Sequence, residues 1–228
     1  MLGFWKVVKQ LEHHYGPPAG PVSRDPFELI LYENIAYLVS DDRREQAFRE
    51  LKKRVGPRPA DILMAPVKEL AEITAIGGIF PDLRARRLQE SAQLVRDQFG
   101  GNLRRALALD PAQARKALQK FPVIGEPGAD KILLFTGTVP SLAPESNGLR
   151  VLVRLGFIKE HKNYSSMYRA AQTALQDECG NDCAPPRMFE KVIAAHQMFK
   201  RHGQELCRRS APRCEACPLN KTCPSASA

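Results

Sequence analysis

Four cysteines late in the chain have the residue type and spacing of a metal site. They are Cys207, Cys214, Cys217 and Cys223, which fall within seventeen residues. Thiolate sulfur is a soft ligand for zinc or for the iron of an iron–sulfur cluster, and so short a segment surrounds only one such centre. The spacing alone does not separate the two. A zinc ribbon normally takes two Cys-x2-Cys pairs from separate hairpins, and this segment has one such pair.

A second candidate site lies in residues 118–134, which read LQKFPVIGEPGADKILL. We expect a helix that ends near Phe121, a tight Pro-Val-Ile-Gly turn, and a second helix that starts around Gly128. Glycines at Gly125 and Gly128 let the backbone approach a phosphate closely, and N–H groups at a helix start bind anions. Lys131 adds positive charge to such a contact. A plain turn between packed helices is the alternative.

Together the two motifs resemble the endonuclease III family of DNA-repair glycosylases and its relative, the mispair-specific adenine glycosylase. The cysteine spacing is similar to that family's iron–sulfur cluster loop, as are His202-Gly203 and residues 211–214 beside it. The second motif resembles the helix-hairpin-helix of the same superfamily. The resemblance covers nearly the whole chain, and it implies a [4Fe-4S] cluster bound by the four cysteines.

The resemblance also implies an all-α fold of two helical domains with a DNA-binding cleft between them. One is a six-helix domain of residues 26–137, with the hairpin at about 113–136. The other joins residues 1–25 to 138–228 and carries the cluster loop at 207–223. Because chemistry on a stacked base requires that base to be flipped out, the implied partner is double-stranded DNA with a damaged or mismatched base.

The chain departs from the family at the position of the lyase lysine. Lyase members have a lysine just after the hairpin glycine that forms a Schiff base with the sugar, and Pro127 matches that position here. Proline has no primary amine, so we predict a monofunctional glycosylase in base excision repair. Lys131, one helical turn further on, is the alternative nucleophile for an abasic-site lyase. A non-catalytic DNA-binding paralogue is the third interpretation.

Glu145 is the first candidate catalytic residue. Family members have an aspartate after the hairpin and an arginine five residues later, and Glu145 and Arg150 match these positions. A carboxylate there stabilises a cationic sugar or orients a water for attack on the anomeric carbon. The longer side chain displaces the charge by about 1 Å, which can cost roughly 100-fold in rate. The alternative is a surface residue before a helix capped by Ser146 or Asn147.

Glu28 is the second candidate. It matches the glutamate with which the adenine glycosylase protonates the departing base, but Tyr32 and Glu33 stand where that enzyme has glutamines. This departure makes adenine specificity doubtful. We predict that Tyr32 or Asn34 contacts the flipped base or its orphaned partner, although an aromatic residue at helical spacing is more often part of a core.

Arginines and one apolar turn complete the predicted DNA surface. Residues 77–81 form a turn whose apolar tip is suited to wedging into the base stack, and Arg84 follows it to meet phosphate. Val123 is the expected contact in the hairpin turn. The cluster loop is flanked by further phosphate-binding candidates, namely Arg208, Arg209 and Arg213. A solvated charged face is the alternative for both arginine groups.

Helices must position these residues, because apolar residues recur at helical spacing along most of the chain. The expected helices cover residues 26–39, 43–55, 67–73, 84–99, 111–120, 129–135, 149–155, 165–176 and 188–199. No βαβ alternation or internal repeat is present, which argues against a Rossmann or barrel enzyme.

Composition places the chain among ordinary globular proteins, with 43% hydrophobic and 26% charged residues. The net charge of +9 favours a polyanionic partner such as nucleic acid. Residues 1–16 lack the apolar run of a signal peptide. We expect a cytoplasmic monomer without membrane contact, associated with the nucleoid if bacterial, whose cysteines are thiols or metal ligands. Cys179 and Cys183 lie outside the four-cysteine pattern, and we do not expect them to bind metal.

Overall fold

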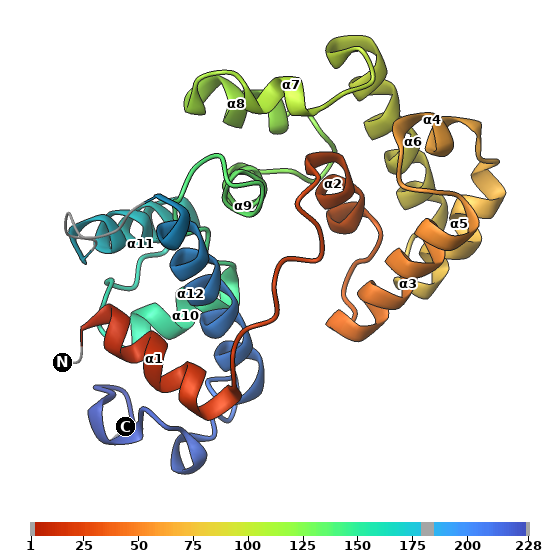
Figure 1. The fold of residues 1–228 in the computed structure, drawn as a ribbon. Coiled ribbons are helices and arrows are strands. Elements are labelled where there is room, and N and C mark those ends of the chain that lie inside the picture. The colour runs from red at the N-terminus through yellow and green to blue at the C-terminus, as the bar shows by residue number, and fades with distance from the viewer. Residues whose placement is uncertain (1–2, 179–184, 227–228) are drawn as a thin grey trace. The chain divides into compact units, whose positions relative to one another are not determined.

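The computed structural model describes residues 3–178 and 185–226, and Figure 1 shows its course. Within these residues every regular element is a helix, which confirms the predicted all-α fold. The extended pairing found there is a single parallel bridge between Tyr37 and Gly78. None of the described helices is long and apolar enough to cross a membrane. Cys179 and Cys183 lie outside the described residues.

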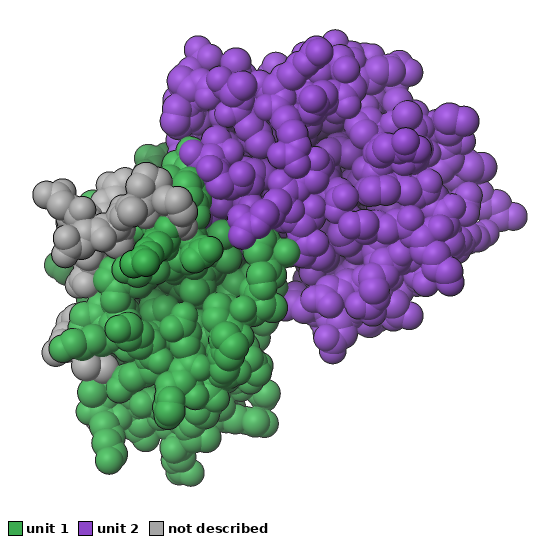
Figure 2. Space-filling model, in the orientation of Figure 1, with its two compact units in different colours: residues 1–21, 139–228 green, residues 22–138 purple. Residues whose placement is uncertain are grey.

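The chain divides into two compact units, which Figure 2 colours separately. Residues 22–138 make the continuous unit, and residues 1–21 with 139–228 make the split unit. The continuous unit contains α2 (Pro26–Asn34), α3 (Asp41–Arg54), α4 (Pro59–Met64), α5 (Val67–Ile76), α6 (Pro81–Phe99), α7 (Arg104–Leu107), α8 (Pro111–Leu118) and α9 (Glu126–Phe135). The split unit contains α1 (Phe4–Tyr15), α10 (Ser146–Arg154), α11 (Tyr164–Glu178) and α12 (Pro185–Glu205), followed by two short 3-10 turns at Cys214–Ala216 and Asn220–Thr222.

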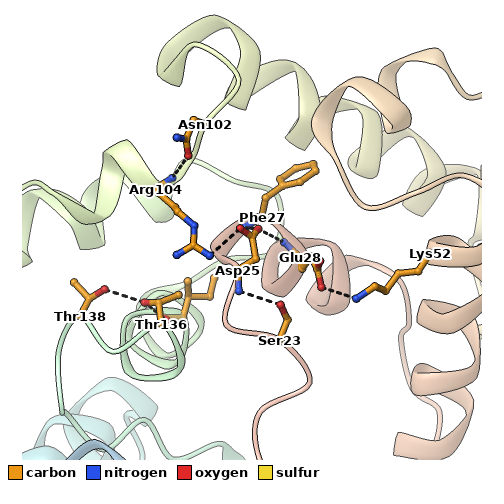
Figure 3. Close-up of polar contacts among 10 residues, drawn as sticks. Ser23, Asp25, Phe27, Glu28, Lys52, Asn102, Arg104, Thr136 and Thr138 are labelled. Carbon is orange, nitrogen blue, oxygen red and sulfur yellow. Dashed lines mark hydrogen bonds and ion pairs between the residues drawn. The ribbon is translucent and has the colours of Figure 1, made fainter. Parts of the chain in front are cut away.

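Asp-Pro pairs start two of the helices in the continuous unit. The Asp25 carboxylate accepts hydrogen bonds from the N–H groups of Phe27 and Glu28, at 3.0 and 3.2 Å, and so caps α2 (Figure 3). Asp110 caps α8 in the same way. Proline suits the first helical position, where its missing N–H costs no hydrogen bond. Asp25 also pairs with Arg104 at 3.3 Å, which ties α7 to the start of α2.

The predicted helix over residues 26–39 ends early, at Asn34. The chain then turns away through Leu38, whose φ is 55°, and the Tyr37 N–H bonds to the carbonyl of Gly77 at 2.9 Å. This contact between distant segments replaces the last helical turn that periodicity predicts. Three helices were not predicted at all, namely α1, α4 and α7.

Each unit has its own apolar core. In the continuous unit α6 buries Ala85, Leu88 and Val95 against the neighbouring helices. In the split unit the ring of Phe4 lies 5.2 Å from Phe199 of α12, which fixes α1 on that helix. These cores position helices whose ends and connecting turns carry the candidate site residues.

Candidate functional site

The four cysteines of residues 207–223 gather around one cavity of about 270 Å³ in the split unit. All four are free thiols of intermediate exposure, and Arg213 lies on the same wall. Among the described residues, no three His, Cys, Asp or Glu side chains converge on a position for a single ion. The four cysteines therefore line one cavity, but their side chains do not meet at a position for a single ion.

Hydrogen-bond donors reach the sulfurs of Cys207 and Cys217 in this loop. Arg154 donates from Nη1 to Cys207 Sγ at 3.3 Å, and the Leu219 N–H donates to Cys217 Sγ at 3.4 Å. Donors of this kind, together with burial, tune the potential of iron–sulfur clusters. Burial raises the pKa of the Cys217 thiol, so a thiolate there gains from a positively charged metal core.

A buried histidine connects this loop to α1. His202 is 2% exposed, its Nδ1 lies 2.9 Å from Tyr15 Oη, and its Nε2 lies 3.6 Å from Cys217 Sγ. Burial lowers the pKa of His202 to about 4 and raises the pKa of Tyr15, so at neutral pH the imidazole is neutral and the phenol protonated. If Tyr15 donates to Nδ1, the ring proton must sit on Nε2 and point at the sulfur.

Glu145 is the N-cap residue of α10 and is half-buried, which differs from the alternative of a cap at Ser146 or Asn147. The Asn147 Nδ2 donates to Glu145 Oε1 at 2.9 Å, and Arg150 Nη2 donates to Asn147 Oδ1 at 2.8 Å. Arg150 continues from Nε to the carbonyl of Cys207 at 2.9 Å. We call Glu145, Asn147, Arg150 and Cys207 the α10 network, because it links the candidate carboxylate to the cysteine loop.

A glycine makes this network possible. A Cβ at Gly203 would lie 2.6 Å from the carbonyl oxygen of Asn147, a separation that real side chains do not show. The Gly203 carbonyl also accepts from Arg150 Nη2 at 2.7 Å. The sequence matched Arg150 to the family's arginine and offered Asn147 as a helix cap, but it did not predict that the two side chains bond to each other, although their three-residue spacing on a helix was the available signal.

A large cavity of about 860 Å³ lies beside α10 in the split unit. We call it the arginine cavity, because Arg150, Arg154, Arg208 and Arg209 all line it. Ser146 and Asn147, next to Glu145, form part of its wall, and Tyr164 of α11 forms another part. Arg208 and Arg209 are exposed, as their predicted role requires, and so is Arg213.

The predicted hairpin is present as α8, a turn over residues 119–125, and α9. Val123 in the turn is 54% exposed and has a φ of 59°. Gly125 has an extended backbone, and a Cβ added there would meet nothing closer than 3.9 Å. At Gly128 the nearest atom would be at 3.5 Å, an ordinary contact. The packing of the chain itself therefore does not demand either glycine.

Lys131, on α9, forms an ion pair with Glu33 of α2. The Nζ lies 2.7 Å from Glu33 Oε1, and each side chain is only about a fifth exposed, at 21% and 22%. The Lys131 amine, which the alternative lyase mechanism requires, is thus engaged in an ion pair with the Glu33 carboxylate.

The other candidates on α2 lie in different surroundings. Glu28 forms an ion pair with Lys52 at 2.9 Å, which Figure 3 shows. The Tyr32 ring packs edge-on against Phe48 with centroids 5.4 Å apart, and burial raises its pKa. Tyr32 thus belongs to the packing between α2 and α3.

Asn34 lines a cavity of about 420 Å³ within the continuous unit, which we call the Asn34 cavity. Its walls come from the end of α2, from the start of α6 with the preceding turn, and from the hairpin. The lining residues are Glu33, Asn34, Ala36, Tyr37, Ile79, Phe80, Leu83, Arg84, Arg87 and Val123.

The prediction that Arg84 meets phosphate is wrong for this structure. Arg84 is 3% exposed, and its guanidinium donates to the carbonyls of Thr74, Gly77 and Gly78 at 2.5 to 2.7 Å. It caps the end of α5 and holds the turn before α6. The exposed arginine of this stretch is Arg86.

Comparison with known proteins finds no matching family model. The chain is 21% identical over 206 residues to endonuclease III of Thermotoga maritima, covering 90% of this chain and 86% of the relative. It is 22% identical to the adenine DNA glycosylase of Buchnera aphidicola, covering 98% of this chain and 58% of that protein.

Solved structures share the fold over nearly the whole chain. A trapped covalent intermediate of endonuclease III with DNA superposes with a TM-score of 0.75 at 21% identity, covering 100% of this chain and 98% of that one. A thermostable thymine-DNA glycosylase gives a TM-score of 0.73 at 20% identity, with 98% and 97% covered.

Proposed function

We propose that this chain, a member of the endonuclease III-like helix-hairpin-helix superfamily, is a DNA glycosylase that hydrolyses the bond between sugar and base in double-stranded DNA. The observation that carries the proposal is the placement of Glu145. Its carboxylate is half-buried at the start of α10 and held by Asn147 and Arg150 rather than free in solvent. A positioned carboxylate stabilises an oxocarbenium-like sugar and orients the attacking water.

Two groups of the chain support DNA as the partner. Exposed Arg208 and Arg209 line the arginine cavity next to α10, where they neutralise phosphates on either side of the reacting nucleotide. The hairpin offers Gly125, where an added Cβ would meet no atom of the chain closer than 3.9 Å, and Gly128, where it would meet Ile124 at 3.5 Å. Space above a backbone at a helix start suits the close approach of a phosphate.

We propose base removal without strand cleavage. Pro127 has no amine, and the Nζ of Lys131 is held by Glu33 Oε1 at 2.7 Å rather than free to attack a sugar. A monofunctional enzyme needs only the carboxylate and a water. The relatives named endonuclease III and adenine DNA glycosylase agree with DNA glycosylase as the enzyme class.

The cysteine loop is proposed to hold a [4Fe-4S] cluster. Four thiols around a shared cavity leave room between the sulfurs for several iron atoms, whereas a lone zinc draws four sulfurs to one point at about 2.3 Å. When bound, the cluster supplies a rigid cross-link and an electron-transfer centre. The chain's own contribution is to present Cys207 to Arg150 and so complete the α10 network.

The first test is a panel of duplexes that carry uracil, hypoxanthine, alkylated or oxidised bases, followed by hot alkali to reveal abasic sites. We expect base release from at least one duplex, and we expect E145Q to reduce the rate on the order of 100-fold or more while DNA binding is retained. E28Q tests the second candidate carboxylate, and we expect it to reduce the rate less than E145Q does, because the Glu28 carboxylate is paired with Lys52. Tight DNA binding without base release from the whole panel would overturn the proposal.

Borohydride trapping tests the absence of lyase chemistry. A Schiff base leaves a covalent protein–DNA adduct after reduction, and we expect none. An adduct that forms with the wild-type protein and disappears in K131Q would assign the alternative lyase mechanism to Lys131.

A further inference from the structure

His202 is a buried polar residue that the proposed base release does not use. It lies on α12, is 2% exposed, and places its two ring nitrogens against different parts of the split unit. Nδ1 lies 2.9 Å from Tyr15 Oη at the end of α1, and Nε2 lies 3.6 Å from Cys217 Sγ in the cysteine loop. Burying a polar ring costs free energy unless its nitrogens have partners, so these two contacts account for a histidine here rather than an apolar residue.

Tyr15 is held in position by Arg201. The guanidinium of Arg201 lies over the Tyr15 ring at 4.6 Å, and its Nη1 donates to the Tyr15 carbonyl at 3.0 Å. Arg201 is in turn paired with Glu205 at 2.7 Å. These contacts keep the phenol on the Nδ1 side of the His202 ring, where its hydroxyl can either donate or accept a hydrogen bond.

The charge on the Cys217 sulfur decides the direction of these hydrogen bonds. A neutral imidazole, the form that burial favours, carries its proton either on Nδ1 or on Nε2. With the proton on Nδ1, the Nε2 lone pair would face a sulfur that is negatively charged when it binds iron. With the proton on Nε2, the N–H points at that sulfur and Tyr15 donates its hydroxyl to Nδ1. A cluster bound by Cys217 therefore selects the second arrangement, in which both nitrogens have favourable partners.

Cys217 then receives two hydrogen bonds, because the Leu219 N–H donates to the same sulfur at 3.4 Å. Each donor stabilises negative charge on the sulfur, and a bound cluster becomes more negative by one charge when it takes up an electron. Hydrogen bonds to the sulfurs are among the factors that set the potential of iron–sulfur clusters. A donor at Cys217 is therefore expected to stabilise the reduced form more than the oxidised form, and so to raise the reduction potential.

We propose that His202 tunes the reduction potential of the [4Fe-4S] cluster by donating a hydrogen bond from Nε2 to Cys217 Sγ, and that Tyr15 is a positioning residue that keeps the ring in the required tautomer. This inference rests on the proposed function, of which the cluster is part. Because Tyr15 belongs to the first helix and Cys217 to the end of the chain, the potential depends on how α1 packs in the split unit. The proton stays on Nε2 throughout, and only an electron is exchanged with the external donor.

Potentiometric titration with dye mediators tests this inference, because it measures the reduction potential of the cluster directly. H202L removes the donor and fills its place with an apolar side chain. We expect its potential to fall so that the ratio of reduced to oxidised cluster at the wild-type midpoint drops about tenfold, which is about 59 mV for one electron. H202Q keeps an N–H group near the position of Nε2, so we expect it to recover most of this shift.

Two further variants separate the hydrogen bond from packing. Y15F removes the hydroxyl that fixes the tautomer but keeps the ring, so we expect a fall in potential that is smaller than in H202L. H196L is the matched control, because His196 is 4% exposed on the same helix and its Nδ1 lies 2.8 Å from the carbonyl of Ala143 rather than beside a cysteine. H196L should keep the wild-type potential, although it also replaces a buried histidine.

A spectroscopic measurement decides the case in which H202L does not retain its cluster. Histidine labelled with ¹⁵N is incorporated into the wild-type protein, and electron–nuclear double resonance is recorded on the reduced, paramagnetic cluster. We expect a coupling to a histidine nitrogen. The coupling should disappear in H202Q, which has no labelled ring beside Cys217, and remain in H196L.

The outcomes separate the inference from the function beneath it. Equal potentials in the wild type and H202L, or a wild-type cluster without histidine coupling, overturn the inference while the cluster and base release still stand. A shift in H196L as large as that in H202L also overturns it, because the loss of any buried histidine would then explain the effect. A wild-type protein without iron contradicts both the cluster and the inference. Base release is measured on the same preparations, and its absence with the shifts intact contradicts the glycosylase alone.

Discussion

The α10 network and the Asn34 cavity differ in whether their polar groups are hydrogen-bonded within the chain. In the network the polar side chains bond to one another, from Glu145 through Asn147 and Arg150 to the Cys207 carbonyl. In the cavity a buried acceptor on Asn34 lacks a partner, and the surrounding side chains are apolar and exposed.

The two regions illustrate two ways in which a fold can prepare for a ligand. A reacting carboxylate must be held in place before the substrate arrives, so its hydrogen bonds are made within the protein. A recognition surface gains affinity only from contacts that form on binding, so its apolar side chains stay exposed and its backbone carries strain until then. The following predictions test that contrast, from the largest expected effect to the smallest.

Removing one cysteine of the loop should have the largest effect. We expect the wild-type protein to be brown and to contain iron, and we expect C217S to lose both. C217S should also lower the stability of the split unit by several kcal/mol, because a metal site that forms only in the folded state contributes its binding free energy to folding. Iron analysis and thermal unfolding measure both effects. C179S is the control outside the loop and should keep its iron. A colourless wild-type protein with stoichiometric zinc would contradict the cluster.

Acid should weaken the split unit through His202. Its pKa is about 4 in the folded protein against 6.5 ordinarily, so between these pH values the unfolded chain takes up a proton that the folded chain does not. The free energy of unfolding should therefore fall as pH falls from about 6.5 to 4, by about 3 kcal/mol in total, and be unaffected above that window. Denaturant titrations across this range measure the slope. H202Q should remove this dependence on pH. An equal fall in the free energy of unfolding in the wild type and in H202Q would show that His202 is not its cause.

Two glycines should respond in opposite ways to the same substitution. G203A should lower stability by about 1–3 kcal/mol, because its Cβ would lie 2.6 Å from the carbonyl oxygen of Asn147. G125A meets no atom within 3.9 Å and should unfold like the wild type, yet bind DNA more weakly, since the methyl group occupies the proposed phosphate position. Thermal unfolding measures the stability of both variants, and fluorescence anisotropy measures their affinity for DNA. Weakened folding of G125A would show that the hairpin glycine serves packing.

Relieving strain at the rim of the Asn34 cavity should stabilise the protein slightly. F80G removes a side chain at a φ of 57°, where glycine has no steric penalty, so we expect stability to rise by about 1 kcal/mol. DNA affinity should fall, because the rim loses its most exposed ring. M64G, at the exposed end of α4, should instead lose a little stability. A destabilised F80G with normal DNA affinity would assign Phe80 to the fold.

The helical fold was largely predictable, because the apolar periodicity of a helix and the Asp-Pro pair at its start both depend on residues that are close together in the sequence. The nine expected helices all have counterparts in the structure. The end of α2 was not predictable, since it depends on Tyr37 pairing with Gly77, some forty residues away. Helix α1 could have been predicted, because its buried Phe4, Val7, Val8 and Leu11 recur at helical spacing.

The candidate site was predictable in residue type more than in geometry. The cysteines and Glu145 stand out in the sequence by spacing and resemblance, and their roles stay predictions. The burial of Arg84 was hidden, because an arginine that caps three carbonyls reads the same in sequence as one that meets phosphate. The unpartnered Oδ1 of Asn34 was also invisible, since it depends on where Pro122 places its carbonyl.

The division of the split unit into residues 1–21 and 139–228 sets an order for biosynthesis. As the ribosome releases the chain, α1 emerges before α12, which its Phe4 contacts and whose His202 bonds to Tyr15. The continuous unit can close as soon as residue 138 is out. The support that Cys207 gives to Arg150 arrives only with the cysteine segment, so an unfinished polypeptide has its hairpin before its carboxylate is anchored.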